Sequence, residues 1–270
     1  MGAIYAPLLG GFDPRTSHGT LWSSCQGRGA YQSNPSLNAS APTTRLAYLE
    51  QHARSPMSAN AKPATRPPTT DTDSQPAPPE QARPLRLPLG PLRPLSAENP
   101  PKGLLIASEW GKARSDHPTS NLMRKANTFL NLASEKGGRE GRGMQVQGIR
   151  SLGSAALDLA WCASGSVDVF WEGGCWEWDV CAGMAILYEA GGLSTDANAP
   201  PAESPLWKDD AALPPASLGA RRFLCIRPCA PDEQDHGDAS ISQQRVARAI
   251  WRALHLDGLD YQREGVDYPT

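Results

Sequence analysis

The chain has 270 residues, which is room for one large domain or two of ordinary size. Its 26 lysines and arginines nearly balance its 28 aspartates and glutamates, so the net charge is −2. This balance excludes a nucleic-acid binder that depends on bulk positive charge. The sequence contains no apolar run long enough to span a membrane and no leader-like start, so we expect a cytoplasmic protein that binds neither nucleic acid nor membrane.

The first 35 residues have the pattern of a β-hairpin followed by a third strand. Gly2–Pro7 and Gly19–Trp22 predict two strands, and Gln26–Tyr31 predicts a turn that leads into the next one. We therefore expect residues 1–35 to form part of an antiparallel sheet.

Proline dominates the next segment, because 15 of the 26 prolines lie from Pro35 to Pro101. This segment has few aromatic residues and cannot bury enough apolar surface to offset the entropy of ordering it. The composition predicts a disordered insertion over 36–101. Its P-x-x-P pieces also fit a partner of the SH3 type.

Strands and helices alternate over 102–258, which predicts an α/β or layered α+β fold. A helix capped by Thr119 or Ser120 has its apolar residues at Leu122, Met123, Ala126, Phe129, Leu130 and Ala133. Strands are predicted over 103–108, 144–152, 167–171 and 222–227, further helices over 154–163, 179–190 and 242–254, and a tail over 259–270.

The six cysteines form no C-x-x-C pair, so we expect no disulfide framework. Cys162 and Cys181 lie in apolar, helix-like stretches, where a cysteine usually behaves as a small buried hydrophobic residue. We therefore expect both side chains to be buried.

Four carboxylates lie at the ends of predicted elements: Asp168, Glu172, Glu177 and Asp179. Asp179 stands at the start of a helix, where it can cap free N–H groups. It can equally bind a hard cation, because Mg²⁺ is held by one or two carboxylates together with substrate phosphate and water. Glu172 has the position of a solvated strand end, and Asp168 and Glu177 are expected to be solvated as well.

A second candidate site is the turn Gly153-Ser154-Ala155, where a predicted strand runs into a helix of small residues. Free N–H groups at such a helix start can hold an anion or a hydroxyl group. The alternative is a tight turn in which Ser154 only caps the helix.

Two long runs, Gln147–Glu172 and Trp178–Gly192, resemble the inositol monophosphatase family. The second run is similar to the family signature W-D-x-A-A-G-x-x-[IL]-[LV]-x-E-A-G-G, with Cys181 where alanine is usual. Gly2–Pro7 and Gly27–Tyr31 resemble the family's hairpin, and Leu105–Gly111 resembles its next strand, particularly in fungal members.

The resemblance implies an α-β-α-β-α sandwich of the sugar-phosphatase type and a Mg²⁺-dependent phosphomonoesterase that hydrolyses inositol monophosphate to inositol and phosphate. By position, Asp179 matches the carboxylate that binds metal and substrate, and Glu172 matches the acid that contacts the inositol hydroxyls. Gly153, Ser154 and Ala155 match the substrate-binding turn. The expected partner is a small phosphorylated polyol, and the expected assembly is a homodimer.

The family's first signature, D-P-[IL]-D-G-T, is absent from these 270 residues. Asp13-Pro14 and Gly19-Thr20 look similar, but their spacing is wrong. We therefore expect an N-terminally shortened member with an incomplete sandwich and little Mg²⁺-dependent activity, because phosphoryl chemistry with two metals needs several carboxylates. The alternatives are an inactive remnant or fragment of the family, or a family phosphatase for a nucleotide bisphosphate or a quinate-pathway phosphate.

Overall fold

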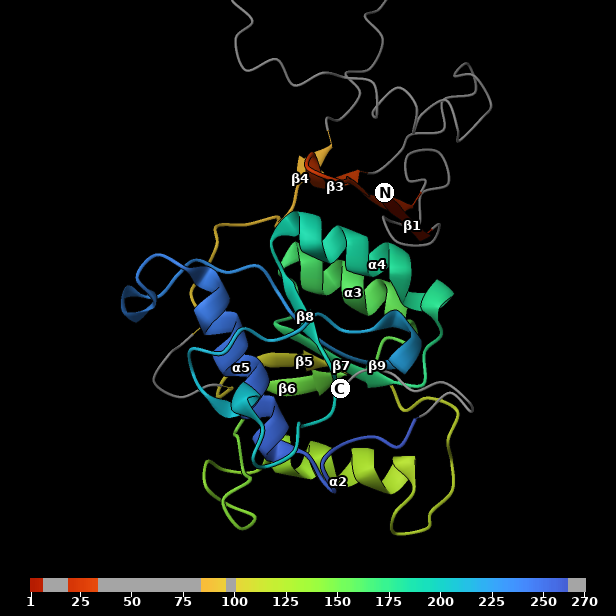
Figure 1. Ribbon diagram of the computed structural model, residues 1–270. Helices are drawn as coiled ribbons and strands as arrows, with labels where there is room; N and C mark the ends of the chain where they lie inside the picture. Colours follow the sequence, from red (N-terminus) through yellow and green to blue (C-terminus); the bar gives the residue numbers. More distant parts are fainter. Residues whose placement is uncertain (7–18, 34–83, 96–100, 262–270) are drawn as a thin grey trace, which may run out of the picture.

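The computed structural model describes residues 1–6, 19–33, 84–95 and 101–261, and these residues form four layers (Figure 1). A four-stranded sheet lies on helices α3 (Ala155–Ser164) and α4 (Glu177–Ala190), which cover one face of a five-stranded sheet. Helices α2 (Asn121–Ala133) and α5 (Ala239–Ala253) lie beyond the other face. The layered α/β class is therefore confirmed, and the described residues form four layers of the expected sandwich.

The first sheet is antiparallel, in the order β1 (Gly2–Ala6), β2 (Thr20–Cys25), β3 (Gly29–Ser33) and β4 (Leu85–Arg86). The predicted hairpin is confirmed by the pairing of β1 with β2 and of β2 with β3. Strand β4 then adds to β3, where Tyr31 is paired with Arg86.

The expectation of disorder over 36–101 is wrong for residues 84–95. This segment forms β4 and buries Leu87 and Leu95, which are 4% and 1% exposed. Leu87 joins the core between the first sheet and the second, and Leu95 joins the core on the far side of the second sheet. Buried leucines at both ends of the segment overcome its proline content. Residues 36–83 and 96–100 lie outside the described residues.

The second sheet has the order β6 (Gly148–Arg150), β5 (Leu105–Ala107), β7 (Val169–Gly173), β9 (Arg222–Ile226) and β8 (Leu193–Thr195). Strand β5 is parallel to both β6 and β7, whereas β9 is antiparallel to β7 and β8. The carboxyl ends of β5 and β7 therefore meet at one edge of the sheet. Strand β8 was not predicted, because it has three residues and directly follows the helix stop at Gly191.

Local helix signals are well reflected in the structure. Ser154 caps α3 by accepting a hydrogen bond from the Leu157 N–H at 3.4 Å. Gly165 and Gly191 end α3 and α4 in the left-handed conformation, with φ of 81° and 93°. The helix stops are therefore confirmed, since only glycine adopts this conformation without a steric cost. The described residues also contain three single turns of 3₁₀-helix, at Pro205–Trp207, Leu218–Ala220 and Glu233–Asp235.

Helix α4 is fixed to its neighbours by two residues of the second signature. A Cβ atom on Gly183 would lie 2.6 Å from the Leu159 Cβ, so the close contact between α3 and α4 requires glycine there. At the other end of α4, the Glu189 carboxylate accepts hydrogen bonds from the N–H groups of Gly27 and Gly29, both at 2.9 Å. The signature therefore joins the hairpin layer to the helical layer.

One expectation about burial is wrong, and the burial along α2 is mixed. The buried residues of α2 are Lys125, Thr128, Asn131 and Leu132, whereas Leu130 is 52% exposed. Polar residues therefore share the buried face of this helix with Leu132. Cys162 is buried as expected, but Cys181 is exposed on α4. Within the described part of the chain, no helix is long and apolar enough to cross a membrane.

Candidate functional site

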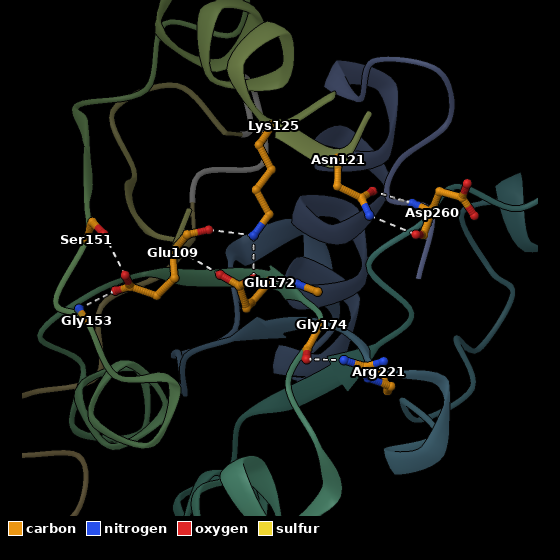
Figure 2. Close-up of polar contacts among 10 residues, drawn as sticks. Glu109, Asn121, Lys125, Ser151, Gly153, Glu172, Gly174, Arg221 and Asp260 are labelled. Atoms are coloured by element: carbon orange, nitrogen blue, oxygen red, sulfur yellow. Dashed lines mark hydrogen bonds and ion pairs between the residues drawn. The ribbon is translucent and has the colours of Figure 1, made fainter. Parts of the chain in front are cut away.

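Polar side chains gather where β5 and β7 end, beside the starts of α3 and α4 (Figure 2). Glu109 follows β5 by two residues, and Glu172 is the penultimate residue of β7. Asp168, in contrast, precedes β7 and therefore lies at the opposite edge of the sheet. Its carboxylate pairs with Arg227 at 2.6 Å, so Asp168 is not a solvated member of this site.

Glu172 is buried, which contradicts its expected place as a solvated strand end. Its Oε1 atom accepts hydrogen bonds from the Lys125 Nζ at 2.5 Å and from its neighbour Gly173 N–H at 2.8 Å. Its Oε2 atom accepts from the Glu109 N–H at 2.6 Å, and Lys125 also donates to the Glu109 carbonyl at 2.5 Å. Burial raises the pKa of Glu172, and the Lys125 ammonium opposes this shift. The ion pair thus joins α2, β5 and β7 (Figure 2).

The chain's last described residues cover this ion pair. A Cβ atom on Gly173 or Gly174 would lie 2.7 or 2.9 Å from the Tyr261 ring. The Asn121 side chain holds the main chain of Asp260 by two hydrogen bonds: its Oδ1 accepts from the Asp260 N–H at 2.7 Å, and its Nδ2 donates to the Asp260 carbonyl at 2.8 Å. Residues 259–261 are therefore docked and are not a loose tail, while 262–270 lie outside the described residues.

The turn at Gly153 is engaged by a carboxylate of the chain itself. The Oε1 atom of Glu109 accepts from the N–H groups of Leu152 at 2.5 Å and Gly153 at 2.7 Å. Its Oε2 atom accepts from the Ser151 hydroxyl at 2.6 Å. Of the N–H groups at the predicted turn, that of Gly153 is thus paired with an internal anion. Ser154 caps α3, and Ala155 begins that helix. Sequence reasoning missed Glu109, which has no signal beyond its place after a strand.

Asp158, in the first turn of α3, is completely buried. Neither of its carboxyl oxygens has a hydrogen-bond donor among the described residues. Burial raises its pKa to about 8, and the negative charge of the nearby Glu109 adds to this shift. Asp158 is therefore neutral at pH 7, and the neutral form can donate a proton toward Glu109.

Asp179 is exposed and is the third residue of α4, because the helix begins at Glu177, two residues earlier than predicted. The helix cap is Trp176, so the expectation that Asp179 is the N-cap is wrong. The Asp179 Oδ2 atom accepts from the Trp176 N–H at 2.9 Å, in the manner of a capping box. Its Oδ1 atom makes no hydrogen bond with a described residue and can bind a ligand.

Aromatic rings surround the loop beside Asp179. The rings of Trp176 and Trp178 are stacked, with centroids 5.3 Å apart, and Trp178 is 69% exposed. The Arg221 guanidinium lies 3.8 Å from the centroid of the Trp176 ring. Arg221 also donates to the Gly174 carbonyl at 2.6 Å (Figure 2). The cluster of tryptophans was visible in the sequence, but nothing there linked Arg221 to it.

Among the described residues of this site, one side chain is available to bind a metal ion. In residues 1–6, 19–33, 84–95 and 101–261, no three His, Cys, Asp or Glu side chains are grouped so that they could hold a metal ion. Asp179 offers one open carboxylate oxygen, whereas Glu172 already accepts three hydrogen bonds. This donor set suits a shared contact with a hard cation and cannot enclose one alone.

The model of the inositol monophosphatase family matches residues 89–244, which is more than half of the chain. The chain belongs to the inositol monophosphatase family. The match begins within the segment 84–95 and includes the buried Leu95. The resemblance seen in the two signature runs is thus confirmed.

Several curated proteins are similar to the chain. The quinic acid degradation cluster protein x of Neurospora crassa is 50% identical over 180 residues, which is 67% of this chain and 50% of that protein. Protein qutG of Emericella nidulans is 50% identical over 170 residues, 63% of this chain and 48% of that protein. Inositol monophosphatase 2 of Saccharomyces cerevisiae is 40% identical over 147 residues, 54% of this chain and 41% of that protein.

The chain thus spans about half the length of the curated relatives it matches. Among solved structures, the inositol monophosphatase of Anabaena (Nostoc) sp. PCC 7120 is 27% identical. That comparison covers 59% of this chain and 48% of the other, with a TM-score of 0.38.

Proposed function

We propose that this chain is part of a metal-dependent phosphatase that removes the phosphate from a phosphorylated cyclic polyol. The observation that carries the proposal is the open Oδ1 atom of Asp179, whose carboxylate is oriented by its bond to the Trp176 N–H. Mg²⁺, when bound there, would polarise the phosphoryl group. Membership of the inositol monophosphatase family supports this chemistry.

The elements around Asp179 would support phosphate binding and fix the loop that precedes α4. The first N–H groups of α4 point toward the same end of the helix, which favours a phosphate beside the metal. The Lys125–Glu172 pair fixes the end of β7, from which the loop 174–176 leads to Asp179. A direct contact between Glu172 and ring hydroxyls, or between the turn 153–155 and the substrate, stays a prediction, because both groups already have internal partners.

Two kinds of ring are supported as substrates. The family name and Inositol monophosphatase 2 of yeast favour inositol monophosphate. The two fungal relatives with 50% identity include one named for quinic acid degradation, and quinic acid is a cyclic polyol that carries a carboxylate. A phosphorylated cyclic polyol is the class that these two share, and a nucleotide bisphosphate is a third substrate to be tested.

The proposal is tested by measuring phosphate release from inositol 1-phosphate and from phosphorylated quinate, with Mg²⁺ and then with EDTA. Release that requires Mg²⁺ and stops with EDTA is the result expected of the phosphatase. A chain that neither binds nor hydrolyses either ester in the presence of Mg²⁺ would contradict the proposal.

A second candidate is a non-catalytic family member that only binds the ester. It is favoured because no three metal-binding side chains are grouped together among the described residues. Two-metal phosphoryl transfer needs more ligands than Asp179 provides. Calorimetric binding of the same esters without phosphate release would identify this second function, and turnover that EDTA abolishes would exclude it.

A further inference from the structure

We propose that Arg221 binds a carboxylate on the ring of the substrate, so that the site selects a carboxylated cyclic polyol phosphate over an uncharged ring. This inference rests on the function proposed above and names the substrate class of the same site. Three observations support it: the contacts of the Arg221 side chain, its charge without a carboxylate partner among the described residues, and its backbone conformation.

The guanidinium of Arg221 is held in a fixed position. It lies 3.8 Å from the centroid of the Trp176 ring and 5.8 Å from that of Tyr261. Its Nη2 atom donates to the Gly174 carbonyl at 2.6 Å, and its Nε atom donates to the Cys175 carbonyl at 3.4 Å. The Nη1 atom donates to no described residue. One edge of an oriented guanidinium is therefore left for a ligand, at little further entropic cost.

No described carboxylate neutralises Arg221. Three cations of the second sheet and its surroundings do have such a partner, since Lys125 pairs with Glu172, Arg222 with Asp196, and Arg227 with Asp168. Arg221 is half-buried and has only carbonyls and aromatic rings around it, so its positive charge attracts an anion. A carboxylate carries one charge and needs few donors, which matches the one free Nη1 group better than a phosphate dianion does.

Arg221 and Asp179 both contact Trp176, Arg221 on its ring and Asp179 on its N–H. One small substrate can therefore reach both groups, with its phosphate at Asp179 and its carboxylate at Arg221. The stacked ring of Trp178 is 69% exposed and offers a flat apolar surface to the C–H face of a cyclic polyol.

The backbone of Arg221 is unusual for its type. Its φ is 59°, in the left-handed region that glycine or asparagine adopts at lower cost. A turn alone would be better formed by glycine, which lacks a guanidinium. Such conformations are concentrated at binding and catalytic sites, where the side chain compensates for the cost.

The test compares three probes by calorimetry in the presence of Mg²⁺: phosphorylated quinate, inositol 1-phosphate, and the methyl ester of phosphorylated quinate. The methyl ester keeps the phosphate and lacks the charge of the carboxylate. We expect the wild-type chain to bind the acid about tenfold more tightly than the methyl ester, as one charge-assisted hydrogen bond provides. In Arg221→Gln, this acid-to-ester ratio should fall close to one. Arg221→Lys, which keeps the charge and loses the planar fork, should give an intermediate ratio.

The matched control is Arg252→Gln, because Arg252 also lies over a tryptophan, 5.6 Å from the Trp207 ring centroid, away from this site. This variant should keep the wild-type ratio. Equal binding of acid and ester by the wild-type chain would overturn the assignment without any variant, and so would an unchanged ratio in Arg221→Gln.

Two further outcomes separate this inference from the proposed function. Binding of inositol 1-phosphate without discrimination between acid and ester overturns only the role of Arg221. If none of the three probes binds, the proposed function fails as well. Adenosine 3′,5′-bisphosphate serves as a fourth probe, and tighter binding of it than of the acid, lost in Arg221→Gln, would show that the second anion is a phosphate and contradict the carboxylate assignment.

Discussion

Asp158 is a carboxyl group that burial keeps neutral at pH 7, and this makes the stability of the fold depend on pH. Its pKa is raised to about 8, whereas an unfolded aspartate titrates near pH 3.8. Between these values the folded chain holds one more proton than the unfolded chain, so the free energy of unfolding falls as pH rises. The same proton allows Asp158 to lie beside Glu109 without repulsion between two carboxylates.

Asp158→Asn keeps the shape of the side chain and removes its titration. Relative to the wild type, we expect this variant to gain stability between pH 5 and pH 9, on the order of a few kcal/mol. Over most of this range the wild type must take up a proton to fold, whereas the asparagine variant does not. Thermal unfolding as a function of pH measures this difference. Asp210→Asn, at an exposed aspartate, is the control. Parallel pH curves for Asp158→Asn and the wild type would contradict a neutral Asp158.

Individual site residues were predictable from the sequence only where they belong to a local sequence pattern. Asp179 was found from its place at a helix start and from the family signature. Lys125 was missed because a lysine in an amphipathic helix is usually solvated, and its burial depends on Glu172, which is 47 residues away. Arg221 was missed for the same reason, since its partners belong to the loop 174–176 and not to its own segment.

At the scale of elements, the contact between α3 and α4 depends on a glycine. A methyl group at Gly183 would lie 2.6 Å from the Leu159 Cβ, inside any normal van der Waals distance. We expect Gly183→Ala to destabilise the fold by about 1–3 kcal/mol through overpacking. Urea unfolding measures the loss.

A second substitution tests whether the contact itself causes this loss. Leu159→Ala alone should destabilise the chain by about 2–5 kcal/mol, because Leu159 is completely buried. The double variant should lose less than the sum of the two single variants, since the shortened side chain makes room for the new methyl group. Strict additivity would show that a clash with Leu159 does not cause the loss in Gly183→Ala, since helix propensity alone favours alanine over glycine.

Elements defined by local signals were predicted, and elements defined by distant partners were not. The caps at Ser154, Gly165 and Gly191 are local, and the structure confirms them. Strands β4 and β8 have two and three residues and exist only because β3 and β9 pair with them. No residue pattern of that length distinguishes a strand from a loop.

At the scale of the whole molecule, the residues that the structure describes form two cores, one on each face of the second sheet. The segment 84–95 contributes Leu87 to one core and Leu95 to the other, although its composition predicts disorder. The composition of a segment indicates how much apolar surface it can bury by itself. Here the two leucines are buried against residues from the rest of the chain. The family match from residue 89 onward includes Leu95.

Leu95→Ala tests this role of the proline-rich segment. Leu95 is 1% exposed, so we expect its truncation to reduce the free energy of unfolding by about 2–4 kcal/mol. Leu92→Ala is the matched control in the same segment, because Leu92 is 48% exposed and should change stability by less than about 0.5 kcal/mol. Chemical denaturation compares the two, and equal small effects would mean that the segment does not pack on the core.

The central claim, that Asp179 binds the metal of a phosphatase, is tested most directly by calorimetric titration of Mg²⁺ into the chain with inositol 1-phosphate present. Asparagine can still accept the Trp176 N–H but lacks the charge that Mg²⁺ requires. For Asp179→Asn we therefore predict a melting temperature within ~2 °C of the wild type and a loss of Mg²⁺ affinity of about tenfold or more, while Asp210→Asn binds as the wild type does. An Asp179→Asn variant that binds Mg²⁺ as tightly as the wild type would contradict the account and leave Asp179 with a structural role in the capping box alone.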